Sequence, residues 1–228
     1  MSLDQPASAR AFWAIYDWTG IRPEFLIPVL DYESGLNPTV SNSQGAPYYG
    51  IGQNSEAAIA AAGTDVASYL TWPASKQLTA VVLPYFEAIV QQYGALTSGV
   101  RVYQAEFYPA SLAYAQGPDD IIVKHGDAAY SANAGFDYGK KGYISPRDLA
   151  QAIASRANAP EVKAAISAAY AERPIMGPPK DPIWGETSGL SRAQWISVGV
   201  LAALGAVYVT WELGGAPRWA RRFWQVVG

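Results

Sequence analysis

The chain lacks cysteine altogether and has a single histidine, His125. Without cysteine, neither a disulfide framework nor a thiolate zinc site can form. A Ser-His-Asp triad or a histidine-ligated metal centre would depend on His125 alone, in the loop-like sequence KHG. We therefore expect no catalytic triad, no metal and no cofactor, and interpret His125 as a solvent-exposed loop residue.

Charged residues are also scarce. They make up 15% of the 228 residues, against roughly 25% in an average protein, and the formal net charge is −3. This composition gives no general attraction to nucleic acid, whose binders carry a basic surface, so we exclude nucleic acid as a partner. Hydrophobic residues reach 50% and aromatic residues 13%, which is enough to form a substantial core.

Alternating β-branched stretches are nearly missing up to residue 173, while apolar residues recur at helical spacing. The fold class predicted for residues 1–173 is therefore mainly α. The predicted helices cover residues 7–18, 23–34, 54–62, 64–70, 75–93, 101–115, 118–131, 145–156 and 159–171.

The sequence changes character after residue 173. Residues 174–192 are rich in proline and glycine and are predicted to form a linker. Within residues 193–228, the apolar run ISVGVLAALGAVYVTWEL at 196–213 would be about 27 Å long as a helix, close to the roughly 30 Å of a bilayer core. Tryptophans flank the run, and RWARRFW follows it. We predict a membrane-spanning helix with a basic, aromatic tail; a helix buried in the domain is the alternative.

The arginines behind this run weakly favour a cytoplasmic C-terminus and a domain on the outer side of the membrane. Yet the first residues, MSLDQPASARAFW, contain no apolar run of signal-peptide length that would export the domain. The sequence therefore favours delivery from outside, as by a virus particle, or passage through a holin lesion.

The predicted helix at 23–34 ends before Gly35, a residue typical of left-handed helix caps, which places Glu33 in the last turn. The helix dipole and partial burial there both disfavour a negative charge, so the pKa of Glu33 is expected to be raised. A carboxyl that keeps its proton near neutral pH can act as a general acid on a glycosidic oxygen. Asp31 lies about 200° away around the helix and is not expected to share the site.

Further motifs accompany Glu33. ESGLNP at 33–38 is followed by SNSQGAPYYGIGQ at 41–53, by Gln77-Leu78, and by SANAGFD at 131–137. In this order and spacing they resemble the lysozyme-like soluble lytic transglycosylase family, whose pattern is Glu-Ser, a glycine-rich segment ending in Gln, Gln-Leu on a helix, and Asn-Ala-Gly. The resemblance covers about residues 20–156 and implies a lysozyme-like fold.

By this resemblance, Glu33 would be the catalytic acid and then the base that cleaves the β-1,4 bond between N-acetylmuramic acid and N-acetylglucosamine in peptidoglycan, with a 1,6-anhydro product. Ser34 and Gln53 are implied to orient Glu33 and the N-acetyl arm of the sugar. Asn133 is the asparagine of its motif and is implied to bind substrate.

Other candidate substrate-binding residues are aromatic. The family usually has tyrosine directly before the Asn-Ala-Gly motif, where this chain has Ala132, and Tyr130 is the candidate substitute. Tyr48, Tyr49 and Trp72 offer flat faces on which sugars can stack, although such residues are more often part of a core.

Residues 137–148, DYGKKGYISPRD, have the outline of a calcium-binding loop, with acids at the first and twelfth positions, Asp137 and Asp148. Positions 3 and 5 carry glycine and lysine where oxygen ligands belong. We interpret the segment as a metal-free loop in which Lys140 or Lys141 supplies the positive charge.

Together these patterns predict a peptidoglycan lytic transglycosylase anchored in a membrane through residues 196–213, with its catalytic domain facing the cell wall. Its expected setting is a phage particle that opens the wall locally during genome entry, with other virion proteins as further partners. A hydrolytic muramidase of the same fold and a non-catalytic, membrane-anchored virion structural protein are the alternatives.

Overall fold

The computed structural model describes residues 3, 5–42 and 47–173. The predicted linker at 174–192 and the predicted membrane helix and tail at 193–228 lie outside the described residues and stay predictions. Within the described ranges, no helix is long and apolar enough to cross a membrane.

The described part of the chain is mainly helical, as the sequence predicts. Short 3₁₀ or π segments (η) adjoin several α-helices, and η1 joins α5 to α6 without a break, so that residues 74–93 form one helical rod close to the predicted 75–93. The helical elements are α1 (Ala7–Thr19), α2 (Pro23–Ser34), α3 (Glu56–Ala61), α4 (Val66–Tyr69), α5 (Ala74–Gln77), η1 (Leu78–Val82), α6 (Leu83–Tyr93), α7 (Gly99–Phe107), η2 (Pro109–Ala113), α8 (Ala128–Asn133), η3 (Ala134–Phe136), α9 (Pro146–Ala157) and α10 (Pro160–Glu172).

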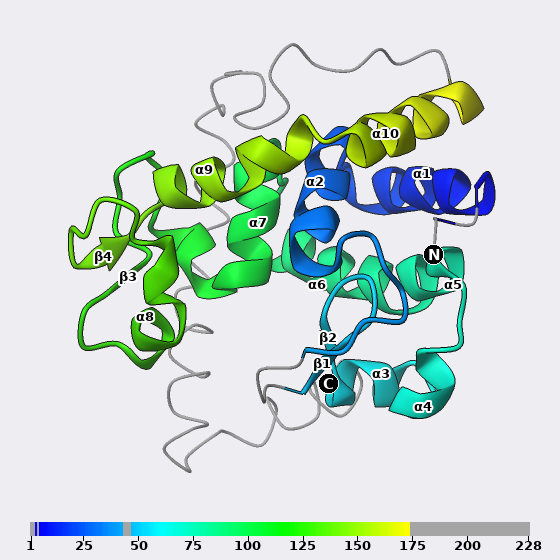
Figure 1. The fold of residues 1–228 in the computed structure, drawn as a ribbon, viewed down its shortest axis with the longest axis horizontal. Coiled ribbons are helices and arrows are strands. Elements are labelled where there is room, and N and C mark those ends of the chain that lie inside the picture. Colours follow the sequence, from blue (N-terminus) through cyan, green and yellow to red (C-terminus); the bar gives the residue numbers. More distant parts are fainter. Residues whose placement is uncertain (1–2, 4, 43–46, 174–228) are drawn as a thin grey trace.

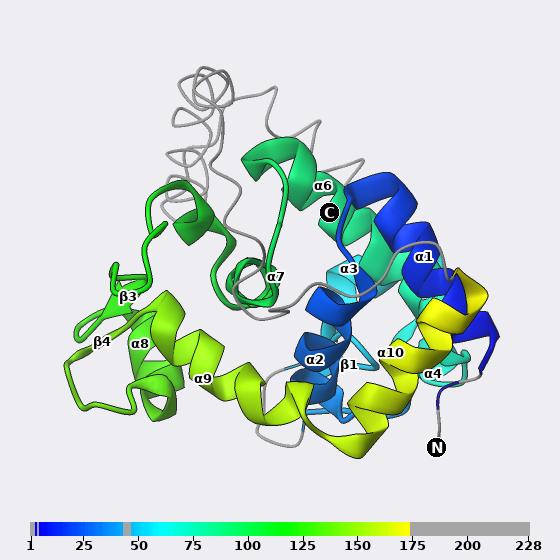
Figure 2. The same ribbon diagram turned by 90° about the horizontal axis from the view of Figure 1, so that it is seen from above.

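Helix α2 lies in the middle of the domain (Figures 1 and 2) and packs against α7, α9 and α10. Every residue from Pro23 to Asp31 is buried, and all of them except Glu24 and Asp31 are apolar. Only its last turn emerges from the core. The end of α2 is therefore a rigid place from which a side chain can reach the surface.

Two short antiparallel strand pairs lie on either side of α2 and α7 (Figure 1). In the first, β1 (Tyr48–Tyr49) pairs with β2 (Asn54–Ser55), with Tyr48 opposite Ser55. In the second, β3 (Val123–Lys124) pairs with β4 (Tyr143–Ile144), with Val123 opposite Ile144. The first pair follows the loop that leaves α2, and the second brackets α8 and η3.

The helix predicted at 118–131 is wrong over most of its length, since α8 covers only Ala128–Asn133. The Asp120 carboxylate accepts hydrogen bonds from the backbone N–H groups of Gln116 and Gly117 at 2.9 and 2.7 Å, which fixes a turn instead of a helix. Strand β3 then follows. Likewise the helix predicted at 101–115 breaks at Tyr108, directly before Pro109, and continues as η2.

Candidate active site

Glu33 lies in the last turn of α2, as the sequence predicts. The helix ends at Gly35, whose φ of 62° is left-handed and whose N–H donates to the Asp31 carbonyl at 2.7 Å. The Glu33 carboxyl is therefore held beside the negative end of the helix dipole, where a second negative charge is disfavoured.

Asp31 points to another side of the same helix. Its carboxylate is 2% exposed and lies 3.7 Å from Nη1 of Arg156 on α9. Burial raises the pKa of Asp31, and the neighbouring guanidinium opposes that rise. The prediction that Asp31 and Glu33 do not share a site is confirmed.

The Glu33 side chain is partly buried and has no lysine or arginine within ion-pair distance in the described ranges. The hydroxyl of Tyr103 on α7 makes the one side-chain hydrogen bond that acts on the pKa of Glu33. Burial raises the pKa of Glu33 to about 7, and the Tyr103 hydrogen bond opposes part of that rise. Near neutral pH, the protonated and ionised forms of this carboxyl are therefore both well populated.

Aromatic side chains from three elements pack into a cluster that includes Tyr103 and the neighbour of Glu33, Tyr32. Tyr32, directly before Glu33, packs against Tyr103 and Phe136, with ring centroids 5.3 and 5.8 Å apart. Phe136 in turn contacts Tyr103 and Phe107 at 6.0 and 5.5 Å. This cluster joins α2, α7 and η3, and Tyr103 links it to the Glu33 carboxyl.

Tyr138, in the loop after η3, is an exposed aromatic residue that interacts with this cluster. It is 45% exposed and shares a side-chain hydrogen bond with Tyr32. An exposed ring that interacts with this cluster offers a face on which a sugar ring can stack. Tyr138 was not among the residues that the sequence singled out.

The Asn-Ala-Gly motif reaches the site through the residues that follow it. Asn133 donates its side-chain N–H to the Ala129 carbonyl at 3.0 Å, within its own helix. The Tyr130 hydroxyl donates to the Asp137 carboxylate at 3.0 Å. Phe136, by contrast, packs on the aromatic cluster beside Glu33. Contacts of Asn133 and Tyr130 with a sugar stay predictions.

The loop at 137–148 is held together by a lysine. The Lys141 ammonium lies 2.7 Å from the Asp148 carboxylate, which also accepts from the Ser145 N–H at 2.8 Å. Asp137 accepts from the backbone N–H groups of Lys141 and Gly142 at 2.8 and 2.7 Å. The carboxylates of Asp137 and Asp148, at positions 1 and 12, thus accept hydrogen bonds from protein N–H groups. Lys141 supplies the positive charge beside Asp148, as one of the two lysines expected from the sequence.

Ser34 connects the end of α2 to the glycine-rich segment. Its hydroxyl lies 2.8 Å from the carbonyl oxygens of both Leu30 and Ile51. Gln53 has a left-handed φ of 46° and donates its side-chain N–H to the Gly50 carbonyl at 3.0 Å, which closes the turn. Both residues therefore shape the backbone next to Glu33, and their contacts with the sugar stay predictions.

The Gln77-Leu78 pair also has a structural role. Gln77 is fully buried, its side-chain oxygen accepts from the Ile51 N–H at 2.9 Å, and its side-chain N–H group donates to the Pro38 carbonyl at 2.8 Å. One amide thus fixes both the loop that leaves α2 and the glycine-rich turn.

The three other aromatic candidates lie around the β1–β2 pair and the start of α5. Tyr48 is 44% exposed, while the Tyr49 hydroxyl donates to Glu56 at 3.1 Å. The Trp72 ring carries the Lys76 ammonium 3.6 Å from its centroid. In the described part of the chain, no hydrogen bond or ring contact joins any of the three to Glu33.

Sequence reasoning missed two residues of α7. Tyr103 is the tyrosine that contacts the Glu33 carboxyl, a position for which Tyr130 had been the candidate. Glu106, one turn further along α7, is a second acid close enough to interact electrostatically with Glu33. The available signal was the pair itself, YQAE, which places a tyrosine and an acid on neighbouring positions of a largely apolar helix.

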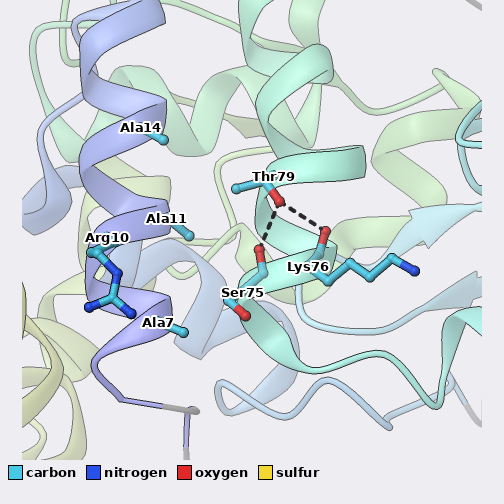
Figure 3. Close-up of a pocket in the computed structure, with 7 residues that line it drawn as sticks. All are labelled: Ala7, Arg10, Ala11, Ala14, Ser75, Lys76 and Thr79. Carbon is cyan, nitrogen blue, oxygen red and sulfur yellow. Dashed lines mark hydrogen bonds between the residues drawn. The ribbon is translucent and has the colours of Figure 1, made fainter.

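The structure also has an open hollow of about 350 Å³ between α1 and the start of the α5 rod (Figure 3). None of the residues predicted to form the site lines it, and its walls combine three alanines with two hydroxyl side chains and two cations. The lining residues are Ala7, Arg10, Ala11, Ala14, Ser75, Lys76 and Thr79.

In the ranges that the structure describes, no group of three or more histidine and acidic side chains is placed to hold a metal ion. His125 lies exposed after β3, with its ring against Tyr130. Comparison with protein-family models, curated proteins and solved structures gave no match to this chain.

Proposed function

We propose that this protein is a peptidoglycan lytic transglycosylase with a lysozyme-like domain, and that Glu33 is its catalytic acid and base. The observation that carries the proposal is the environment of Glu33: a partly buried carboxyl at a helix C-terminus, without a cation partner, whose pKa is raised to about 7. General acid and base catalysis is most effective when the pKa of the group lies near the working pH.

In the first step, protonated Glu33 would give its proton to the glycosidic oxygen between N-acetylmuramic acid and N-acetylglucosamine. The C1–O bond breaks, the N-acetylglucosamine end leaves as an alcohol, and positive charge develops at C1 and the ring oxygen. The ionised Glu33 that results is stabilised by the hydrogen bond from Tyr103.

In the second step, the Glu33 carboxylate would take the proton of the C6 hydroxyl while the C6 oxygen bonds to C1, which forms the 1,6-anhydro ring and restores protonated Glu33. One carboxyl suffices because the nucleophile is part of the substrate. A hydrolase of the two-carboxylate type would need an ionised second acid to activate water. Burial and the charge of Glu33 raise the pKa of Glu106, so this acid tends to stay protonated and is not readily available as the ionised second carboxyl.

The test combines Glu33→Gln with an analysis of products. Wild-type protein should clear peptidoglycan and release muropeptides with 1,6-anhydro ends, detected by mass spectrometry. Glu33→Gln should lower the rate by at least about 10² to 10⁴, the usual contribution of a positioned acid. Glu161→Gln, which alters an exposed acid at the start of α10, is the matched control and should keep full activity.

Three results would contradict the proposal in different ways. Clearing that survives Glu33→Gln would reject this residue as the acid. Products that end in reducing N-acetylmuramic acid would identify a hydrolytic muramidase. No clearing by folded wild-type protein would favour the non-catalytic structural alternative.

The setting is proposed from the sequence alone: a virion-borne enzyme, anchored through residues 196–213, that opens the cell wall during genome entry. Its partners would be the glycan strand, the membrane and other virion proteins. Mass spectrometry of purified particles tests this setting, since a protein absent from the particle would instead act inside the infected cell.

A further inference from the structure

The segment that follows the Asn-Ala-Gly motif sends one ring into the aromatic cluster beside the candidate site. The ring centroid of Phe136 lies 5.8 Å from that of Tyr32, the residue directly before Glu33, and 6.0 Å from that of Tyr103. Phe136 is the last residue of η3, which has only three residues. So short a 3₁₀ turn holds its conformation weakly, so the position of Phe136 depends on contacts outside η3.

The next residue, Asp137, supplies these contacts. Asp137 is only 6% exposed. Its carboxylate accepts hydrogen bonds from the Tyr130 hydroxyl at 3.0 Å and from the backbone N–H groups of Lys141 and Gly142 at 2.8 and 2.7 Å. Its own backbone N–H donates to the Ala134 carbonyl at 3.1 Å. One buried carboxylate therefore ties α8, η3 and the loop before β4 to each other.

Asp137 is ionised over the pH range in which Glu33 would work. Burial disfavours its charge, but hydrogen bonds from the N–H groups of Lys141 and Gly142 and from the Tyr130 hydroxyl hold its pKa below the ordinary value. Asp137 is not among the groups that shift the pKa of Glu33. Its influence on the site therefore comes from the residues that it holds in place, and not from its charge.

We propose that Asp137 is a positioning residue of the candidate site, whose carboxylate anchors the segment after the Asn-Ala-Gly motif and so holds Phe136 in the aromatic cluster. Phe136 in turn keeps Tyr32 and Tyr103 packed beside Glu33. The Tyr130 hydroxyl belongs to this anchor, because it donates to the carboxylate. This inference rests on the proposed function and adds to it a residue that touches neither the sugar nor the reacting atoms.

The first variant loosens the anchor. Asp137→Asn keeps the size of the side chain but replaces one acceptor oxygen by an NH2 group, which cannot accept from a backbone N–H. In peptidoglycan clearing, kcat should fall about tenfold and KM should change less than about threefold, because a small displacement around Glu33 disturbs proton transfer more than sugar binding. Asp120→Asn is the matched control and should keep kcat within about twofold. The Asp120 carboxylate also accepts from two backbone N–H groups, at 2.9 and 2.7 Å, in a turn that contributes no ring to the cluster.

A double variant separates positioning from general damage to the fold. If Asp137 acts through Phe136, adding Asp137→Asn to Phe136→Leu should lower kcat per folded molecule by no more than about twofold. Losses that multiply in the double variant would overturn the proposal, as would a wild-type kcat in Asp137→Asn. Should Asp137→Asn not fold, Tyr130→Phe removes one of the three bonds, and its expected loss of about threefold in kcat should likewise disappear in Phe136→Leu. Circular dichroism measures the folded fraction of each variant.

A measurement without substrate keeps this inference separate from the proposed function. The chain has six phenylalanines, so protein made with 4-fluorophenylalanine gives a small set of ¹⁹F signals, and that of Phe136 is the one missing from Phe136→Leu. In Asp137→Asn this signal should move toward the shift of the free amino acid, and in Asp120→Asn it should stay in place. An unmoved Phe136 signal in Asp137→Asn rejects the inference in an active or an inactive enzyme. Wild-type protein that clears no peptidoglycan rejects the proposed function.

Discussion

The hydroxyl of Tyr103 on α7 contacts the carboxyl of Glu33 at the end of α2. Burial pushes the pKa of Glu33 upward, while this hydrogen bond favours the ionised form and restrains the rise to about 7. The pair therefore sets how readily the carboxyl can both give and take a proton.

Replacing Tyr103 by phenylalanine removes the hydroxyl and keeps the ring that packs against Tyr32 and Phe136. Without the hydrogen bond the pKa of Glu33 should rise further. Because the proposed first step needs protonated Glu33, activity should fall as the pH rises through this pKa. In Tyr103→Phe the alkaline decline of kcat/KM should shift upward by about 0.5 to 1 pH unit, with a lower maximal rate.

The control for this substitution is Tyr93→Phe on α6, whose hydroxyl bonds to the neighbouring Gln92 at 3.1 Å. Its pH profile should match that of the wild type. An alkaline decline that stays in place or moves downward in Tyr103→Phe would show that the hydroxyl does not act on Glu33.

The raised pKa of Glu33 also predicts how stability depends on pH. The folded state binds a proton at Glu33 more tightly than the unfolded chain does, since the pKa is about 7 against 4.5. Its contribution is favourable below the unfolded value and is lost as the pH rises from about 4.5 to 7. The upper limit of this loss is about 3 kcal/mol for a shift of this size, and solvent around the partly exposed side chain reduces it.

Glu33→Gln should remove that loss. Measured by urea unfolding, the variant should be more stable than wild type at pH 8, and the two proteins should be equally stable at pH 4, where Glu33 is protonated in both states. A difference that does not change with pH would contradict the raised pKa.

The end of α10 is held against α1, which makes α10 the last helix of the described domain. Trp13 on α1 donates its indole N–H to the Ala169 carbonyl at 2.5 Å, and Arg173 lies 2.6 Å from the Asp17 carboxylate. We therefore expect a chain without residues 193–228 to stay soluble, folded and active in a peptidoglycan clearing assay. The matched truncation that also removes α10, by deleting 160–228, should unfold, because it exposes the buried Trp13. Aggregation of the shorter deletion would mean that 193–228 belongs to the core.

Local signals predicted the part of the fold that carries Glu33. Proline at the start of α2 and glycine at its end fix the helix boundaries, and both act within a few residues. The turn around Asp120 could not be predicted in this way, because its side chain competes with the helix for the backbone donors. Helical periodicity contains no information on that competition.

The candidate site was likewise predictable only where it depends on residues that are adjacent in the sequence. Glu33 and the loop next to it follow from adjacent residues and from the motif. Tyr103 and Glu106 come from α7, which is distant in the sequence, and they reach Glu33 only because α7 packs along α2. The sequence predicted that the tyrosine of the site lies close to the Asn-Ala-Gly motif. In the structure, the tyrosine that interacts with Glu33 is Tyr103, which lies on α7.

In the glycine-rich turn, Gly50 is the residue that is hardest to replace by any other amino acid. Its φ of 72° is left-handed, and a Cβ there would lie 2.6 Å from a ring carbon of Tyr69 and against the Gln77 amide. Gln77 holds the Ile51 N–H, and Ile51 in turn meets Ser34 beside Glu33. Any group larger than hydrogen at position 50 must therefore displace the contacts that place the loop next to Glu33.

Gly50→Ala should destabilise the domain more than the left-handed backbone alone would. Gly63→Ala is the matched control, because Gly63 has a φ of 76° with nothing within 4 Å of its Cβ position. The control should cost about 1 kcal/mol in unfolding free energy, whereas Gly50→Ala should cost about 2 to 3 kcal/mol more because of the added overlap. Activity per folded molecule should fall in Gly50→Ala alone, and equal losses in the two variants would show that the packing of Gln77 against this turn does not position the site.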